Sequence, residues 1–425
     1  MPFWSLAACL LLSLPAHAQF QLSPVAFVTG ENSAQPSVVA DPGQGFVVTW
    51  QERGAPVHQL KFAVLDALGG EIDRGTIAQG ENWFVNGADF PNLAVLDNGD
   101  WVSFWLQKTS ADTYSYDIRT LRSRDRGKTW DSSVVVHEDA TATEHGFVSM
   151  LAAGGDQVRL VWLDGRRMAG AGGDHEGHEG AAEHMSLRTA TLGRDGKLKD
   201  ARELDDLTCA CCQTDAVRGA TRTLVTYRDR SSAEIRDIGA LVFSGSKWSK
   251  PSLIHADHWT IAACPVNGPA LVARGDRFAV LWPTMAGGDL QVRFAIGDGK
   301  SFAAPVMLAG GAPELGRVDL ATWGDNGFLA TRVRQGNDGT ELVVEELDAK
   351  GRSTSSKSVA NKVGGYPRLA RSGDSALLVW AQAGASSGST RLGLARISAD
   401  LSAAEVARPP IAPAEGRAPA RPLND

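Results

Sequence analysis

Short apolar segments that end in a bulky side chain recur along the chain. They are FVVTW (46–50), VSFW (102–105), RLVW (159–162), LVTY (224–227), AVLW (279–282), FLATR (328–332) and LLVW (377–380). Their last residues are separated by 48 to 65 positions. Short runs of β-branched and aromatic residues between turn residues are typical of buried β-strands. The pattern therefore predicts a repeated unit that contains one such strand.

Each of these strands belongs to a larger repeated unit. A second strand and a glycine turn precede each one, as in PSVVADPGQG and GPALVARGD, and a third strand follows several, as in LKFAVLD. A unit of three or four short strands cannot bury its own faces, and radial stacking of such units makes a β-propeller. We therefore predict an all-β propeller of seven four-stranded blades, with a six-bladed ring as the alternative. The N-terminal LSPVAFVTG resembles the outer strands and is expected to close the ring against the last blade.

The two ends of the chain differ from the repeats. Residues 1–18 are predicted to be a signal peptide, an apolar run followed by the small-x-small cleavage signal Ala16-His17-Ala18. Leu6 to Cys9 resembles a lipobox, so lipoprotein anchoring is the alternative. Residues 19–401 form the predicted propeller, and residues 402–425 form a Pro/Ala-rich tail predicted to be disordered. We expect a periplasmic or secreted protein.

Composition excludes several classes of partner. The chain has 46 Gly and 12 Trp with 21% charged residues, which is typical of a turn-rich globular protein. The formal net charge of -7 argues against nucleic acid and against an anionic membrane surface as partners. No segment after the signal peptide is long and apolar enough to predict a transmembrane helix.

One predicted turn carries a family signal. SRDRGKTW, residues 123–130, fits the Asp-box pattern Ser-x-Asp-x-Gly-x-Thr-Trp, in which an Asp side chain accepts hydrogen bonds from backbone amides of a hairpin turn. AIGDGKSF and VFSGSKW are diverged copies at equivalent positions. The chain therefore resembles the bacterial sialidase-like propellers with BNR (Asp-box) repeats. As architecture, the resemblance covers nearly all of the mature chain.

The resemblance makes exo-α-sialidase activity an alternative function. Sialidases use an arginine triad, a Tyr nucleophile paired with a Glu, and an Asp acid/base. The candidates in this chain are Tyr227 with Glu234, and Asp164 or Asp229 as the acid. The family's early Arg-Ile-Pro motif is absent from the first repeat, which reads AQPSVVADPGQG, so no arginine is assigned to a triad. Hydrolysis is thus not established by the sequence.

Charged residues concentrate in two loops predicted to lie beside the central channel. The arginines expected to bind an anionic or glycan-like ligand are Arg166, Arg167, Arg228, Arg230 and Arg236. Guanidinium groups bind carboxylates through paired hydrogen bonds. The alternative is that these charges form ion pairs that hold the loops in place.

Four cysteines remain after the signal peptide: Cys209, Cys211, Cys212 and Cys264. The first three lie in TCACC, before the first strand of the fourth repeat, and Cys264 aligns with Cys212 in the next repeat. A Cys212–Cys264 disulfide would stabilise the fold by about 4 kcal/mol. The alternatives are convergence of the thiolates on a soft ion such as Cu⁺ or Zn²⁺, and redox chemistry. The sequence leaves all three interpretations open.

The third repeat carries a His-rich insertion. GAGGDHEGHEGAAEHM (170–185) places His175, His178 and His184 among Gly, Ala and acidic residues. Imidazoles at this spacing on a loop can bind Zn or Cu. The alternative is a solvated loop without a ligand.

These observations lead to one expected function and two alternatives. We expect a propeller that binds a small anionic or glycan-like ligand on its channel face. One alternative is an exo-glycosidase of the sialidase type. The other is a copper- or zinc-binding protein built on the cysteines and the His-rich segment.

Overall fold

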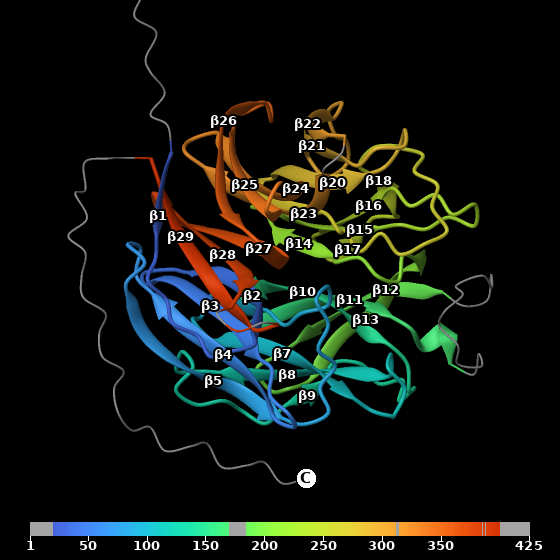
Figure 1. Cartoon of the computed structure of the whole chain (residues 1–425). Coiled ribbons are helices and arrows are strands. Elements are labelled where there is room, and N and C mark those ends of the chain that lie inside the picture. Colours follow the sequence, from blue (N-terminus) through green and yellow to red (C-terminus); the bar gives the residue numbers. More distant parts are fainter. Residues whose placement is uncertain (1–19, 170–183, 312–313, 385, 387, 400–425) are drawn as a thin grey trace, which may run out of the picture.

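The structure is a ring of seven antiparallel β-sheets (Figure 1). It is a computed structural model that describes residues 20–169, 184–311, 314–384, 386 and 388–399. The predicted signal peptide, the predicted tail, His175 and His178 lie outside the described residues. Among the residues that are described, no helix is long and apolar enough to cross a membrane.

Each sheet is one blade, and its strands follow the chain from the central axis outward. Blade 1 contains β2 (Ser33–Asp41), β3 (Gly45–Glu52), β4 (His58–Leu65) and β5 (Glu71–Gly80). Blade 2 contains β6 (Leu93–Val95), β7 (Trp101–Lys108), β8 (Tyr116–Ser123) and β9 (Val134–Val135). Blade 3 contains β10 (His145–Gly154), β11 (Gln157–Asp164), β12 (Met185–Leu192) and β13 (Leu198–Thr208), with the short 3₁₀ helix η1 (Arg166–Met168) after β11.

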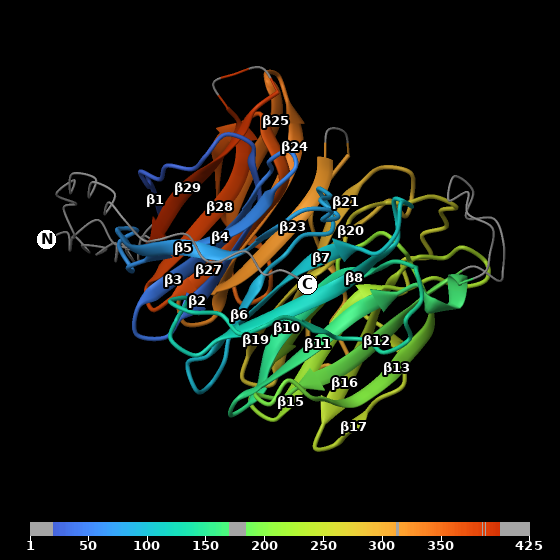
Figure 2. The ribbon, with the colours of Figure 1, turned by 90° about the horizontal axis from the view of Figure 1, so that it is seen from below.

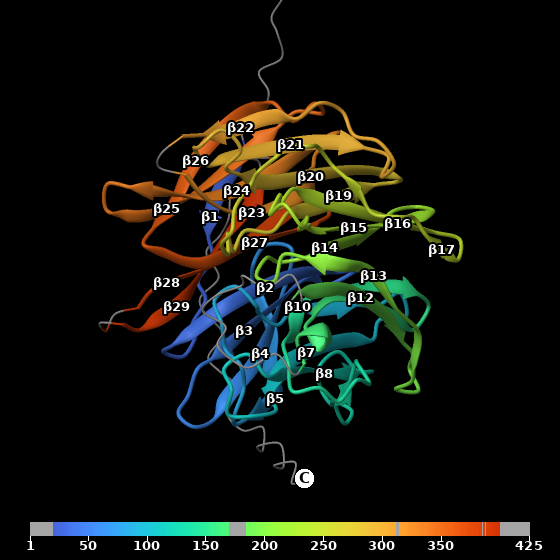
Figure 3. The ribbon, with the colours of Figure 1, turned by 90° about the vertical axis from the view of Figure 1, so that its right-hand side faces the viewer.

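The remaining blades repeat this order. Blade 4 contains β14 (Asp215–Arg218), β15 (Arg222–Arg228), β16 (Ile238–Ser244), β17 (Lys247–Trp248) and β18 (Ser252–Leu253). Blade 5 contains β19 (Ala270–Arg274), β20 (Arg277–Thr284), β21 (Gln291–Gly297) and β22 (Val306–Gly310). Blade 6 contains β23 (Glu314–Trp323), β24 (Gly327–Gly336), β25 (Gly339–Leu347) and β26 (Ser353–Asn361). Blades 3 to 5, in green to yellow, face the viewer in Figure 3.

Blade 7 joins the two ends of the propeller. It contains β27 (Val363–Ser372), β28 (Ser375–Ala383) and β29 (Thr390–Ser398), and its outer strand is β1 (Gln21–Pro24). β1 pairs antiparallel with β29, from Gln21 opposite Ser398 to Pro24 opposite Ala395. Figure 2 shows the blue N-terminal strand beside the red C-terminal strands. The predicted seven blades and the closing N-terminal strand are confirmed, and the six-bladed alternative is wrong.

Phe20 anchors the closing strand. Its side chain is fully buried in the apolar cluster of blades 6 and 7, and its carbonyl accepts a hydrogen bond from Lys357. We expect Phe20→Ala to lower the free energy of unfolding by about 3 kcal/mol, because a buried aromatic ring is replaced by a cavity. Urea titration measures the change, with the exposed Val28→Ala as control. Equal midpoints for the two variants would show that β1 does not hold the ring closed.

The aromatic residues that end the second strands pack between blades. Trp50, Trp162, Trp282 and Trp380 each lie in an apolar cluster that includes residues of the preceding blade. A blade is therefore covered on both faces, as radial stacking requires. This explains why the repeated segments are apolar at almost every position.

The first strands line the axis and are joined by carboxylates. Asp215 accepts a hydrogen bond from the Leu271 amide of the next blade at 2.7 Å, and Asp319 accepts one from the Leu369 amide at 2.7 Å. Between the first strands lies a cavity of about 180 Å³. The ring is thus held at its centre by polar contacts as well as by apolar packing.

The two faces of the ring carry different loops. His145 at the start of β10 pairs with Asp164 at the end of β11, so the first strand begins and the second ends on the same face. We call this the top face. The turn after β8 lies on the opposite face, where Asp125 accepts hydrogen bonds from the Thr129 amide and hydroxyl at 2.8 and 2.7 Å. The loops with unusual chemistry all lie on the top face.

Candidate functional site

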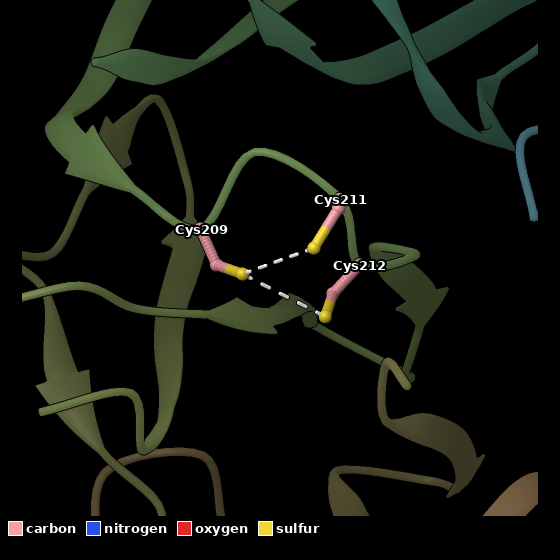
Figure 4. Close-up of side chains that lie close together, drawn as sticks. All are labelled: Cys209, Cys211 and Cys212. Atoms are coloured by element: carbon pink, nitrogen blue, oxygen red, sulfur yellow. Dashed lines mark hydrogen bonds between the residues drawn. The ribbon is translucent and has the colours of Figure 1, made fainter. Parts of the chain in front are cut away.

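Three cysteines converge on the top face of blade 4. Cys209 directly follows β13, and Cys211 and Cys212 lie in the turn that leads into β14. The Cys209 Sγ lies 3.7 Å from the Cys211 Sγ and 3.7 Å from the Cys212 Sγ (Figure 4). The three sulfur atoms all lie within 4.8 Å of one another. Cys209 and Cys212 are each 1% exposed, whereas Cys211 is half-buried.

Cys264 is the exposed member of this group. Its thiol is one of the neighbours that raise the pKa of Cys211, after those of Cys209 and Cys212. The four cysteines form no disulfide in this structure, and the Cys212–Cys264 disulfide stays a prediction. The structure brings three of the thiols together with Cys264 beside Cys211, and we call the four residues the thiol cluster.

Positively charged groups and amides surround the thiol cluster. Arg236 Nη1 donates to the Cys209 Sγ at 3.3 Å, and the Asn267 amide donates to the Cys212 Sγ at 3.3 Å. Hydrogen bonds from the other two thiols, together with the Arg236 charge, hold the pKa of Cys209 well below its usual value although burial opposes this. Burial raises the pKa of Cys212 to about 12. The lowered pKa of Cys209 favours its thiolate form, which is the form that binds a cation.

The predicted ligand-binding arginines of blade 4 are held by this chain. Arg228 donates to the carbonyl oxygens of Arg236, Asn267 and Pro283 at 2.7 to 2.8 Å and is 1% exposed. Arg230 and Arg236 both pair with Glu234, at 2.5 and 2.7 Å. These arginines fix the loop that packs against the thiol cluster. Their contacts match the alternative in which the charges hold the loop in place.

The structure does not bring Tyr227 and Glu234 together. Tyr227 is fully buried, and its hydroxyl donates to Asp205. Burial raises the pKa of the Tyr227 hydroxyl well above its usual value, and the neighbouring Asp205 and Asp229 raise it further. Burial also raises the pKa of Asp229 to about 6. This geometry gives no support to Tyr227 as a nucleophile, and the catalytic roles of Tyr227, Asp229 and Glu234 stay predictions.

The predicted residues of blade 3 form a second lattice. Asp164 is fully buried and accepts from Arg166 Nε at 2.6 Å and from Trp162 Nε1 at 2.8 Å. Burial would raise the pKa of Asp164, but the hydrogen bonds from Arg166 bring it below its usual value. Arg167 pairs with Glu203 at 2.6 Å. Asp164 is thus an ionised carboxylate engaged by its neighbours, and an acid role for it stays a prediction.

His184 is the only predicted histidine ligand among the described residues. It directly precedes β12, on the top face, and its Nδ1 is buried without a hydrogen-bond partner. A site that includes His175 and His178 therefore stays a prediction.

Residues missed by sequence reasoning lie at the mouth of the channel. The Tyr116 hydroxyl lies between two carboxylates, 2.9 Å from Asp89 Oδ2 and 2.7 Å from Glu144 Oε1. Asp89 also lines the central cavity, together with Gln213. These residues are far apart in the sequence and occur in no motif. Alignment of the turns before first strands could have found Asp89 and Glu144, which precede β6 and β10, but not Tyr116, which begins β8.

Comparisons with known proteins support the fold. Searches against protein-family models and among curated proteins each found no match. Among solved structures, the polysaccharide lyase Uly1 matches with a TM-score of 0.52 at 9% identity, over 88% of this chain and 91% of that chain. Leech intramolecular trans-sialidase matches with a TM-score of 0.46 at 11% identity, over 79% of each chain. The K499G mutant of NanB sialidase from Streptococcus pneumoniae matches with a TM-score of 0.43 at 9% identity, over 91% and 95%.

Proposed function

We propose that this propeller, in the periplasm or outside the cell, binds a soft metal ion, Zn²⁺ or Cu⁺, at the thiol cluster. The observation that carries the proposal is the sulfur spacing of 3.7 Å. Ligands at the Zn–S distance of about 2.3 Å stand about 3.8 Å apart around a tetrahedral ion. A disulfide would need about 2.05 Å. The Cys209 sulfur is therefore spaced from those of Cys211 and Cys212 as two ligands of one ion would be.

The charges around the thiol cluster fit a thiolate complex. Zn²⁺ with four thiolates, or Cu⁺ with three, carries a net charge of about -2. Arg236 contacts the Cys209 Sγ directly, and the charge of Arg228 favours the Cys212 thiolate. Two guanidinium groups therefore balance the complex, which lowers the cost of burying it.

The exposure of the cluster favours exchange of the ion with a partner. Cys209 and Cys212 are buried, whereas Cys264 is exposed and Cys211 is half-buried. A structural zinc site is closed on all sides, and a site with one open side admits an incoming ligand. We therefore propose a site that takes up and releases its ion through the side of Cys264.

The experiment combines metal analysis with a thiol count. Purified protein is expected to bind one equivalent of Zn²⁺ or Cu⁺ at this cluster, and Co²⁺ bound there is expected to show a sulfur-to-cobalt charge-transfer band. Cys209→Ser should weaken both binding and the band strongly, because Cys209 contacts both neighbours. Cys264→Ser should weaken them less, because Cys209, Cys211 and Cys212, which lie within 4.8 Å of one another, all remain. A chain without metal and without titratable thiols when denatured would contain disulfides, and the proposal would fail.

The central cavity favours a second candidate function, the binding of a small glycan-like ligand. Asp89, Ser149, Gln213 and Arg368 are among the polar side chains that line its volume of about 180 Å³. Ligand clefts typically measure about 300–1,000 Å³, so only a small ligand fits. The fold is shared with a polysaccharide lyase. Thermal shifts over a panel of neutral and anionic monosaccharides test this candidate, and shifts that survive Arg368→Met would place binding elsewhere.

A further inference from the structure

The thiol cluster has a buried half and an open half. Cys209 and Cys212 are each 1% exposed. Cys211 is half-buried, and Cys264 is exposed. The oxidation of a cysteine depends on its exposure as well as on its thiolate character. A reagent that arrives from solvent therefore meets Cys264 first and Cys211 next.

The loop that carries Cys264 is tied down on both sides. On one side, the Ile261 amide donates to the Glu234 carbonyl at 3.0 Å. On the other side, the Asn267 amide donates to the Cys212 Sγ at 3.3 Å. The loop is therefore held against the turn that carries the other three cysteines.

Cys211 and Cys264 are the two cysteines best placed to be oxidised together. The Cys264 thiol is a direct neighbour of the Cys211 thiol, and both residues reach the surface. A disulfide brings its two sulfur atoms to about 2.05 Å, so neighbouring thiols have only a short way to move. Cys209 and Cys212 are also neighbours, at 3.7 Å, but burial keeps an external oxidant away from both.

Metal binding and disulfide formation compete for the same sulfur atoms. The ligand of a metal ion is the thiolate, and a sulfur atom in a disulfide no longer carries that charge. Disulfides form and persist outside the cytoplasm, which is the location proposed for this protein. The open half of the thiol cluster is therefore the half that an oxidant would remove from the metal site.

We propose that a small-molecule disulfide oxidises Cys211 and Cys264 to a Cys211–Cys264 disulfide, and that this oxidation releases the metal ion. The inference rests on the metal binding proposed above and adds the regulation of that site. Cys209 and Cys212 stay reduced, because the oxidant does not reach them. The ion keeps at most two thiolates and leaves through the open side.

The reaction consists of two thiol–disulfide exchanges. In the loaded site the ligands are already thiolates, so no proton has to be removed first. The Cys264 sulfur attacks one sulfur of the external disulfide RSSR, the S–S bond of RSSR breaks, and one RS⁻ leaves. The Cys211 sulfur then attacks the Cys264 sulfur, and the second RS⁻ leaves. Two electrons pass from the two cysteines to RSSR, the released RS⁻ groups take protons from the solvent, and the ion keeps its oxidation state.

Release of zinc by glutathione disulfide tests the proposal. The mature protein is purified with a reductant, loaded with Zn²⁺, freed of reductant, and mixed with glutathione disulfide and a zinc-sensitive dye. One equivalent of zinc should be released as two equivalents of glutathione form. The affinity for zinc should fall by about 100-fold or more, since loss of an outer partner of a ligand alone costs 10–100-fold. Tandem mass spectrometry of the unreduced digest should show Cys211 joined to Cys264, and a reductant should restore binding.

Two variants separate oxidative release from metal binding. Cys264→Ser should still bind zinc through the other three cysteines, and it should keep the ion in the presence of glutathione disulfide. Ala263→Ser, at an exposed position in the same loop, is the matched control and should release zinc as the wild type does.

The outcomes distinguish this inference from the metal site itself. Zinc that stays bound to the wild-type protein under glutathione disulfide would overturn the inference, and the metal site would stand. Equal release from Cys264→Ser, or a Cys212–Cys264 disulfide in the digest, would overturn it in the same way. Reduced protein that binds no zinc would instead overturn the metal site, and the inference with it.

Discussion

Replacing Arg228 with alanine should lower the free energy of unfolding by about 5 kcal/mol. The guanidinium donates to three carbonyl oxygens at 2.7 to 2.8 Å from a side chain that is 1% exposed. A buried carbonyl that loses its donor costs about 1–3 kcal/mol, so three such oxygens account for most of the loss. The guanidinium also lies 4.7 Å from the ring centroid of Trp259, and this cation–π contact is lost too. Urea titration at neutral pH measures the change.

Arg218→Ala is the matched control. The Arg218 side chain is 43% exposed and pairs with Asp97 at the surface, and such pairs contribute about 0–1 kcal/mol. If Arg228→Ala and Arg218→Ala have the same urea midpoint, Arg228 does not hold the loop of blade 4. The sequence-based expectation that Arg228 binds an external anion would then be favoured.

Repetition made the fold predictable from the sequence. Each blade buries both of its faces, so the second strands read as continuous apolar runs, and the aromatic residue at their ends fills the space against the preceding blade. The outer strands are more exposed and vary from the two residues of β9 to the eleven of β13, so their pattern is weak. β1 could nevertheless be placed, because it resembles outer strands and the ring must close.

The Asp turns show where motif reasoning falls short. Asp125 was found through its Thr-Trp neighbours, and Asp298 through a diverged copy. Asp66 and Asp348 accept the same kind of backbone hydrogen bonds without those neighbours. The turn requires only a carboxylate placed before the amides, so a pattern with a Trp finds only the Asp125 turn of these four.

The candidate site could be predicted only in part. The cysteines were found because three of them lie close together in the sequence. The sequence paired Cys264 with Cys212, whereas in the structure the Cys264 thiol is a neighbour that raises the pKa of Cys211. The roles of the arginines could not be predicted, because both faces of a blade are buried and strand alternation does not separate inward from outward positions. Tyr227 and Arg228 are adjacent, and both are buried.

Asp89→Asn should remove a pH dependence of stability on the order of 4 kcal/mol. Burial raises the pKa of Asp89 to about 7 from an ordinary value of 3.8. The folded state therefore binds the proton more tightly than the unfolded state, so the stabilisation is complete below pH 4 and is lost as the pH rises to about 7. One pKa unit corresponds to about 1.4 kcal/mol. Asparagine keeps the oxygen that accepts from the Phe147 amide and has no proton to lose.

Urea titrations at pH 4 and pH 8 measure this effect. From pH 4 to pH 8, the free energy of unfolding should fall more steeply for the wild type than for Asp89→Asn. Asp215→Asn should also reduce this fall, because burial raises the pKa of Asp215 to about 7 as well. Asp97→Asn, on an exposed carboxylate, is the control. In Asp89→Asn, the asparagine side chain leaves the Tyr116 hydroxyl to donate to Glu144 alone. Parallel pH profiles for the wild type and Asp89→Asn would mean that Asp89 is ionised in the folded channel, and a positive ligand would then be favoured in the central cavity.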